Sequence, residues 1–164
     1  MKPHVTLIVH NIRSTYNVGS ILRTCDGLGV NKVYLTGYTP YPKLQDDDRV
    51  PHISAKLEAQ INKTSLGAQN HVKWEHSPDI DQLILELKAQ NIPIFALEQA
   101  QNSIKLNDFE PPQKLALLLG EEVDGVSPDL LKMCQAVIEI PMHGQKESFN
   151  VSVAAAIALY QICS

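Results

Sequence analysis

Three polar segments follow apolar runs in this sequence, and each offers side chains that could bind or transfer a charged group. In the first, residues 11–24, Asn17 lies close to the predicted start of a helix and Arg23 follows six residues later. Exposed amides and the positive end of a helix dipole suit this place to an anion such as a phosphate. Because Arg23 lies roughly one and two-thirds turns beyond Asn17, the two converge only if the arginine side chain extends over the helix N-terminus. A capped helix with a solvated arginine is the competing interpretation.

The second segment, residues 117–127, is an apolar strand that runs directly into Gly120, Glu121 and Glu122. Glycine lets the backbone approach a ligand closely, and ligands of open α/β sheets bind outside the carboxyl ends of the strands. The segment therefore indicates a ligand-binding loop. An acidic surface loop before a capped helix would give the same pattern.

The third segment, residues 140–156, passes from a strand end through a polar loop into a helix rich in alanine. Ser148 and Asn150 offer a hydroxyl and an amide at the helix start. The alanines permit another helix to approach closely, either within the chain or across a dimer, and a capped core helix is the alternative. None of the three segments matches the glycine patterns of dinucleotide-binding or P-loop proteins, which disfavours those two classes.

Apolar runs typical of strands alternate with helical patterns, which predicts an α/β fold with a mainly parallel sheet and helices on both faces. The predicted strands cover residues 5–10, 32–36, 72–75, 94–98, 115–119 and 137–140, and the predicted helices cover residues 17–28, 53–62, 80–90, 127–133 and 150–162. Residues 37–52 hold three prolines and an acidic run, so they are expected to form a long loop of the kind that often carries function. The 164 residues are expected to form one domain.

Composition narrows the possible functions. The chain is 44% hydrophobic and 20% charged, which provides enough apolar material for a buried core. No apolar run approaches the roughly 18 residues of a membrane span, and the start of the chain shows no signal-peptide pattern, so a cytoplasmic location is expected. The three cysteines lie far apart without a Cys-x-x-Cys pair, which disfavours a disulfide framework or a zinc site.

The net charge of −4 disfavours nucleic acid as a partner, because neutralised phosphates normally supply most of that affinity. A few cations gathered around one cleft could still bind phosphate. The candidates for such contacts are Arg13, Lys43, Arg49, Lys56 and Lys146. For each of them taken singly, a solvated surface charge is the alternative.

Taken together and in this order, the three segments resemble the three motifs of the SPOUT methyltransferase superfamily, in its SpoU/TrmH branch. The resemblance covers essentially the whole chain. It includes residues 64–68, which are similar to the Ser-x-Gly-Ala segment of the branch, and residues 96–98 at a strand end. The chain resembles a minimal catalytic domain of this branch without the N-terminal extension that many relatives carry.

The resemblance implies a fold and an activity. The C-terminal segment, roughly residues 137–164, is expected to thread through a loop as a deep trefoil knot, an exception to the general absence of knots. The implied activity is the transfer of a methyl group from S-adenosylmethionine to a ribose 2′-oxygen of RNA, either tRNA or rRNA, without a metal. The 2′-hydroxyl makes RNA, and not DNA, the substrate. A homodimer with active sites shared across its interface is expected. No membrane partner is expected.

Carried over by motif position, the implied catalytic residues are Asn17, Arg23, Glu122, Ser148 and Asn150, and the implied cofactor-binding residues are Leu97, Gly120, Ile140, Met142, Ser148 and Phe149. Glu121 stands where the branch usually has a small or amide residue, which adds negative charge near the cofactor. In the family proposal Arg23 activates the hydroxyl. Arginine side chains stay protonated at neutral pH, so Arg23 is not favoured as a general base. We favour a role in which Arg23 binds the adjacent phosphate and stabilises the negative charge that develops on the ribose oxygen.

Three other functions compete with this one. Methylation of a base is the reaction of other SPOUT branches, but the Asn17/Arg23 and Ser148/Asn150 pairs favour ribose. A knotted RNA-binding protein without catalysis is disfavoured because the motif residues are intact. A flavodoxin-like domain explains the α/β alternation but not the alanine-rich last helix and its entry.

Overall fold

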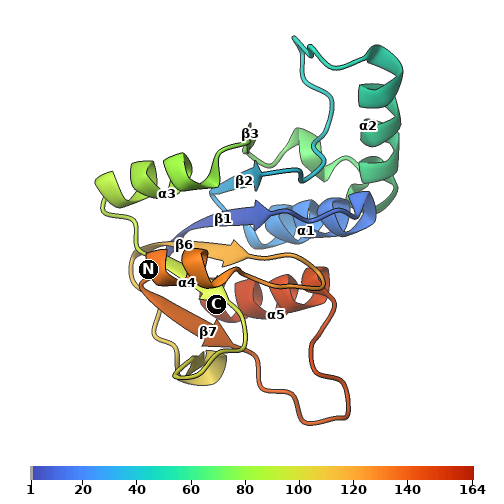
Figure 1. Ribbon diagram of the computed structural model, residues 1–164. Helices are drawn as coiled ribbons and strands as arrows, with labels where there is room; N and C mark the ends of the chain where they lie inside the picture. The colour runs from blue at the N-terminus through green and yellow to red at the C-terminus, as the bar shows by residue number, and fades with distance from the viewer. Residues whose placement is uncertain (1) are drawn as a thin grey trace.

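The computed structural model describes residues 2–164, and their strands form one seven-stranded sheet in which all neighbouring strands run parallel (Figure 1). The strands are β1 (His4–His10), β2 (Lys32–Thr36), β3 (Trp74–Ser77), β4 (Ile94–Leu97), β5 (Ile104–Lys105), β6 (Lys114–Leu119) and β7 (Ala136–Glu139). Their order across the sheet is β3-β2-β1-β6-β4-β7-β5. The predicted α/β fold with a mainly parallel sheet is confirmed.

Helices cover both faces of this sheet (Figure 1). They are α1 (Thr15–Leu28), α2 (Pro51–Ser65), α3 (Ile80–Ala89), α4 (Pro128–Met133) and α5 (Val151–Cys163), with short 3-10 turns η1 (Ala68–Asn70) and η2 (Leu106–Asp108). Strand β1 shows the two faces, because Leu7 and Val9 join the core under α1 and α5 whereas Ile8 joins the core under α3 and α4. Helix α2 does not lie on the sheet and packs instead against α1.

The two central strands determine where the site forms. Residues 115–119 of β6 are at most 1% exposed, so this strand is buried on both faces as its continuous apolar run predicts. Strand β6 pairs with β1 along its length, and Val9 lies opposite Leu119. Because the strands are parallel neighbours that end at this pair, the loops after them leave the same edge of the sheet together.

Most predicted elements agree with the structure to within one or two residues at each end. Helix α1 begins at Thr15, and Ser14 is its N-cap, because the Ser14 hydroxyl accepts the backbone N–H of Asn17 at 3.2 Å. Asn17 therefore lies in the first turn, close to the N-cap as predicted, although the helix begins two residues before the predicted residue 17. Gly29 ends this helix in the left-handed conformation (φ 64°).

Two differences have local physical causes. Helix α2 begins at Pro51, two residues earlier than predicted, because proline fits the first helical turn. Strand β5 was not predicted, since a two-residue strand has no periodicity that a sequence pattern could reveal. It forms only by pairing with β7.

Two alanines of the last helix pack within the core of the chain. Ala155 and Ala158 are fully buried in the core that α5 shares with α1. These two alanines therefore pack against a helix of the same chain, and contact of α5 with a second chain stays a prediction. No helix within residues 2–164 is both long and apolar enough to span a membrane. The trefoil knot over residues 137–164 stays a prediction.

Candidate functional site

The loop after β6 reaches across to the start of α1 and binds it. The carboxylate of Glu122 accepts hydrogen bonds from the backbone amides of Arg13 (3.4 Å) and Ser14 (3.3 Å). These amides precede the first turn of α1, where the helix dipole is positive. The helix start therefore does bind an anion, as the sequence predicts, and in the structure that anion is a carboxylate of the same chain.

A chain of side-chain hydrogen bonds extends from this carboxylate to the third segment. Asn17 donates from Nδ2 to Glu122 Oε1 at 3.5 Å and accepts at Oδ1 from Asn150 Nδ2 at 3.3 Å. Asn150 is also the N-cap of α5, since its Oδ1 accepts the backbone N–H of Ser152 at 2.9 Å. Three side chains that the sequence predicts to act together, one from each segment, thus lie in one network.

A hollow of about 530 Å³ opens beside this network at the carboxyl ends of β4, β6 and β7. Its wall includes five of the six predicted cofactor-binding residues, namely Leu97, Gly120, Ile140, Ser148 and Phe149. The sixth, Met142, does not line it. Size and position suit a small organic ligand, because such ligands occupy hollows of roughly 300–1,000 Å³ outside strand ends.

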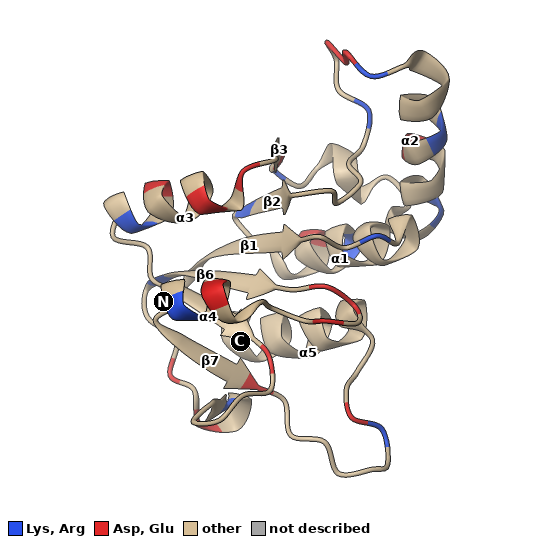
Figure 2. Cartoon of the chain, viewed as in Figure 1, with Lys and Arg blue, Asp and Glu red and all other residues tan. Residues whose placement is uncertain are grey.

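The hollow is strongly acidic. Among the described residues that line it there is no Lys, Arg or His. Five of these lining residues carry carboxylates, namely Glu98, Glu121, Glu122, Asp124 and Glu147. Figure 2 shows several of these acidic residues on the loop that follows β6. A charge distribution of this kind favours a cationic ligand and opposes a phosphate.

The loop from Gly120 to Val126 is held in one shape. Glu121 and Gly125 exchange two backbone hydrogen bonds of 3.0 Å each. A Cβ atom added at Gly120 would lie 2.3 Å from the carbonyl carbon of Gly125, so any side chain there would force the loop apart. Gly125 itself has a φ of 64°, and the carboxylate of Glu98 fills the space where its Cβ would be.

Glu98 and Asn11 are the site residues that sequence reasoning missed. Glu98 Oε2 accepts the backbone N–H of Val126 at 3.1 Å, which ties the end of β4 to the loop after β6. Asn11, with a φ of 52°, donates from Nδ2 to Glu121 Oε1 at 3.2 Å and accepts the backbone N–H of Tyr38 at 3.1 Å. The signal for Glu98 was its place at a strand end. Asn11 has no local signal beyond being an asparagine after a strand.

Arg23 lies apart from this cluster. Six residues separate it from Asn17, which places it roughly 9 Å further along the α1 axis and on another side of the helix. Its side chain is exposed, does not line the hollow, and makes no hydrogen bond or ion pair with the residues that the structure describes. The structure therefore joins Asn17, Glu122 and Asn150 but leaves the predicted catalytic arginine on an outer surface of α1.

His10 closes β1 beside the site. Its Nδ1 lies 2.9 Å from the Thr36 hydroxyl, and burial lowers the pKa of the ring below the usual 6.5, against the opposing influence of the Glu121 carboxylate. Within residues 2–164, no group of three or more His, Cys, Asp and Glu side chains is arranged to hold a metal ion.

With this geometry in place, known proteins supply a comparison for the whole chain. Residues 4–160 match the model of the SpoU rRNA Methylase family. The chain belongs to this family. The three polar segments that meet in the Glu122–Asn17–Asn150 network are thus parts of a SpoU methylase domain.

Individual relatives agree with this assignment. The tRNA (guanosine(18)-2′-O)-methyltransferase of Thermus thermophilus is 29% identical over 160 residues, which cover 98% of this chain and 74% of the relative. The protein of the same name from Aquifex aeolicus is 32% identical over 154 residues, covering 92% of this chain and 64% of the relative.

Solved structures confirm the fold. The Aquifex aeolicus TrmH/SpoU tRNA modifying enzyme superposes with a TM-score of 0.78 at 25% identity, covering 98% of this chain and 76% of that one. The AdoMet-bound rRNA methyltransferase from Sinorhizobium meliloti has a TM-score of 0.83 at 20% identity, covering 99% of this chain and 56% of that one. The chain thus spans between 56% and 76% of the length of these four proteins.

Proposed function

We propose that this SpoU-family chain is an RNA methyltransferase that transfers a methyl group from S-adenosylmethionine to a ribose 2′-oxygen. The observation that carries the proposal is the meeting of the three family segments, where the carboxylate-lined hollow opens directly beside the Glu122–Asn17–Asn150 network. Two relatives are named for 2′-O-methylation of tRNA, and a structural neighbour is described as AdoMet-bound, which supports the reaction and the donor.

The hollow fits this methyl donor in charge and in surface. S-adenosylmethionine would supply a methyl group on a positively charged sulfur, which needs no metal for activation. The carboxylates around the hollow compensate positive charge, and apolar side chains such as Leu97, Ile140 and Phe149 offer contact area for a purine. Gly120 keeps the backbone free for close approach.

The network beside the hollow would orient the ribose. Asn17 is half-buried and Asn150 is exposed, and their amides offer both donors and acceptors to sugar hydroxyls, while Glu122 fixes Asn17. Ser148 lines the hollow and makes no hydrogen bond within the described residues, so its hydroxyl is free for a ligand. The remaining requirement is a cation to stabilise charge on the ribose oxygen as its proton leaves to a phosphate oxygen or water.

We assign that cation to Arg23 of a second copy of this chain. Outward-facing apolar side chains lie on α5 at spacings of four and three residues, with Val153 45%, Ile157 37% and Tyr160 67% exposed. Such a stripe is typical of a protein interface. A homodimer formed through this stripe would carry the exposed Arg23 of one protomer to the ribose network of its partner, where the guanidinium would grip the adjacent RNA phosphate.

The substrate class that follows is a structured cellular RNA, either tRNA or rRNA, and the expected location is the cytoplasm. Methylation of a base and RNA binding without catalysis are the competing outcomes. No feature of the site favours either of them.

Arg23→Lys and Gly120→Ala test the two halves of the site separately. Arg23→Lys keeps the charge but removes the planar fork, so turnover is expected to fall by about 100-fold or more. Calorimetric titration with S-adenosylmethionine should remain nearly unchanged. Gly120→Ala should abolish donor binding, whereas Gly144→Ala, where an added Cβ meets nothing within 4 Å, should behave as the wild type. If Arg23→Lys kept full activity, methyl transfer would not depend on the planar guanidinium group.

Mixing two inactive variants tests whether Arg23 acts across the dimer. After subunit exchange, a dimer of one Arg23→Ala chain and one Gly120→Ala chain contains one intact site only if the arginine comes from the partner. Random exchange then restores about a quarter of the wild-type rate, because half of the dimers have one working site out of two. If the mixture stays inactive although mass analysis shows mixed dimers, the arginine does not act in trans.

A further inference from the structure

A second hollow lies on the other side of the loop that follows β1. Its volume is about 700 Å³. It is bordered by the start of α1 and by the long loop after β2, and α2 forms one wall. Three of the five tyrosines of the chain line it, namely Tyr16, Tyr38 and Tyr41, together with Arg13 and Arg49. None of its lining residues is Asp or Glu, so its chemistry is opposite to that of the acidic donor hollow.

The floor of this tyrosine hollow is a fixed stack. The Arg49 guanidinium lies 3.7 Å from the centre of the Tyr41 ring, and the His76 ring stacks on the same tyrosine at 4.0 Å with an interplanar angle of 15°. Two planar groups at these distances cannot share one face of a ring, so both faces of Tyr41 are covered.

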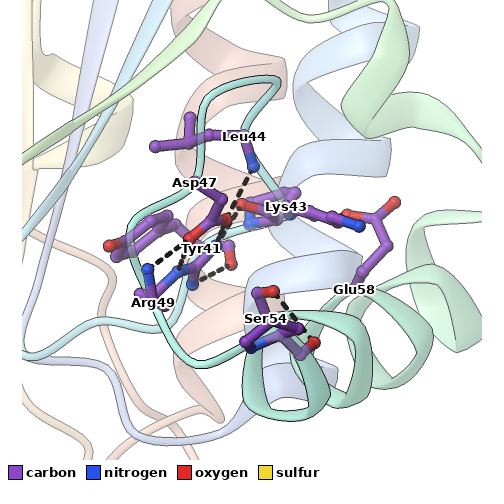
Figure 3. Close-up of polar contacts among 9 residues, drawn as sticks. Tyr41, Lys43, Leu44, Asp47, Arg49, Ser54 and Glu58 are labelled. Carbon is purple, nitrogen blue, oxygen red and sulfur yellow. Dashed lines mark hydrogen bonds and ion pairs between the residues drawn. The ribbon is translucent and has the colours of Figure 1, made fainter.

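Arg49 is also committed within its own loop, as Figure 3 shows. Its guanidinium donates to the Asp47 carboxylate and to the backbone carbonyls of Tyr41 and Pro42, both at 3.0 Å. Arg49 therefore braces the loop, and its contacts leave it less available to a phosphate than the sequence suggested. These contacts fix the conformation of the long loop where it lines the hollow.

Tyr38, by contrast, is available to a ligand. Its side chain is 49% exposed, and the Arg13 guanidinium lies 5.5 Å from the centre of its ring. Arg13 forms no ion pair within the described residues. An exposed aromatic ring next to an unpaired guanidinium is the combination on which single-stranded nucleic-acid bases stack while a phosphate is neutralised.

The two hollows are coupled through short connections. Asn11 accepts from the Tyr38 backbone and donates to Glu121, which lines the donor hollow. The backbone of Arg13 donates to Glu122, which lines it as well. A ribose held at the Glu122–Asn17–Asn150 network would therefore have the donor hollow on one side and the tyrosine hollow on the other.

We propose that the tyrosine hollow binds an unpaired nucleobase of the substrate RNA next to the methyl-transfer site, with Tyr38 as the stacking surface and Arg13 on the neighbouring phosphate. This inference rests on the proposed RNA methylation, and it adds the requirement that the RNA is unpaired at this point. The side-chain amide of Gln60, which lines the hollow and has no hydrogen bond within the described residues, is placed to contact a base edge.

Tyr38→Leu and Tyr38→Phe separate stacking from bulk. With labelled S-adenosylmethionine and total RNA from cells that lack the gene, Tyr38→Leu should raise the RNA concentration for half-maximal rate by about tenfold or more. Tyr38→Phe should remain within about twofold of the wild type, because it keeps the ring. The maximal rate and the calorimetric affinity for the donor should be unchanged in both. An unchanged half-maximal RNA concentration in Tyr38→Leu would overturn the proposal while leaving the methylation itself intact.

A second measurement does not depend on catalysis. Ultraviolet irradiation of the wild-type protein with a short single-stranded RNA of mixed sequence, followed by mass mapping, should place cross-linked nucleotides on peptides that contain Tyr38 or Tyr16. Cross-links confined to other surfaces would contradict the nucleobase site, even if methyl transfer proved absent. Cross-links at Tyr38 without methyl transfer would instead support the site and count against the proposed function.

Discussion

At the scale of single residues, Glu122 has the largest influence on the site, because it binds α1, positions Asn17 and borders the donor hollow. Glu122→Gln removes its charge at the helix N-terminus and one of its two accepting oxygens. The free energy of unfolding should fall by about 1 kcal/mol, and methyl transfer should slow by at least about tenfold. Asp124→Asn is the matched control, since this carboxylate lines the same hollow and makes no hydrogen bond within the described residues. Equal behaviour of the two variants would show that Glu122 has no organising role.

His10 gives the site a predictable response to acid. Its pKa is lowered in the folded protein, chiefly by burial, so the unfolded chain binds a proton first as the pH falls. The stabilising contribution is complete above the unfolded pKa near 6.5 and is lost as the pH falls through that value toward the lower folded pKa. The melting temperature of the wild type should therefore decline more between about pH 7.5 and pH 5.5 than that of His10→Gln. Parallel declines would assign the acid sensitivity to other groups.

At the scale of elements, a single glycine sets the distance between α1 and α2. A Cβ added at Gly19 would lie 2.1 Å from the Thr64 hydroxyl oxygen and 2.3 Å from the Ile61 carbonyl oxygen. Gly19→Ala should therefore cost about 1–3 kcal/mol in chemical denaturation. Gly27→Ala lies on the same helix with nothing within 4 Å of the new methyl group. This variant should therefore raise the free energy of unfolding by about 0.5–1 kcal/mol, because alanine favours the helix over glycine. If both variants lose stability equally, the close helix contact is not the cause.

The elements also show what the sequence alone could predict. Strand β6 follows from its continuous apolar run, because burial on both faces leaves a local signal. The start of α5 at Asn150 follows from residue type at a helix end, because the asparagine side chain caps the helix. Short β5 and the exact start of α1 depend on tertiary pairing and on one side-chain hydrogen bond, which periodicity cannot detect.

The candidate site was predictable only in part, for a related reason. Glu122, Asn17 and Asn150 were found because they lie at strand ends and helix starts within motif-like segments. Asn11 and Glu98 act on segments more than twenty residues away in sequence, so nothing in their own neighbourhood reveals the contact. Arg23 contacts no other predicted site residue within the chain, and the local pattern around it does not reveal this separation.

At the scale of the whole molecule, charge is sorted between two hollows that share one wall. The acidic side suits a cationic donor, and the side with tyrosines and arginine suits RNA, which reconciles a net charge of −4 with a nucleic-acid substrate. Between them lies the network that would hold the ribose. We therefore expect a particular methylated product and not merely binding of both ligands.

The most direct test identifies that product. Total RNA from cells that lack the gene is incubated with the purified protein and S-adenosylmethionine labelled in its methyl group, and the RNA is then digested to nucleosides for mass spectrometry. Label is expected on the ribose, in 2′-O-methylnucleosides, with the wild type and Gly144→Ala, and none is expected with Gly120→Ala. Label on a base, or no label from a dimeric protein that binds the donor, would contradict it.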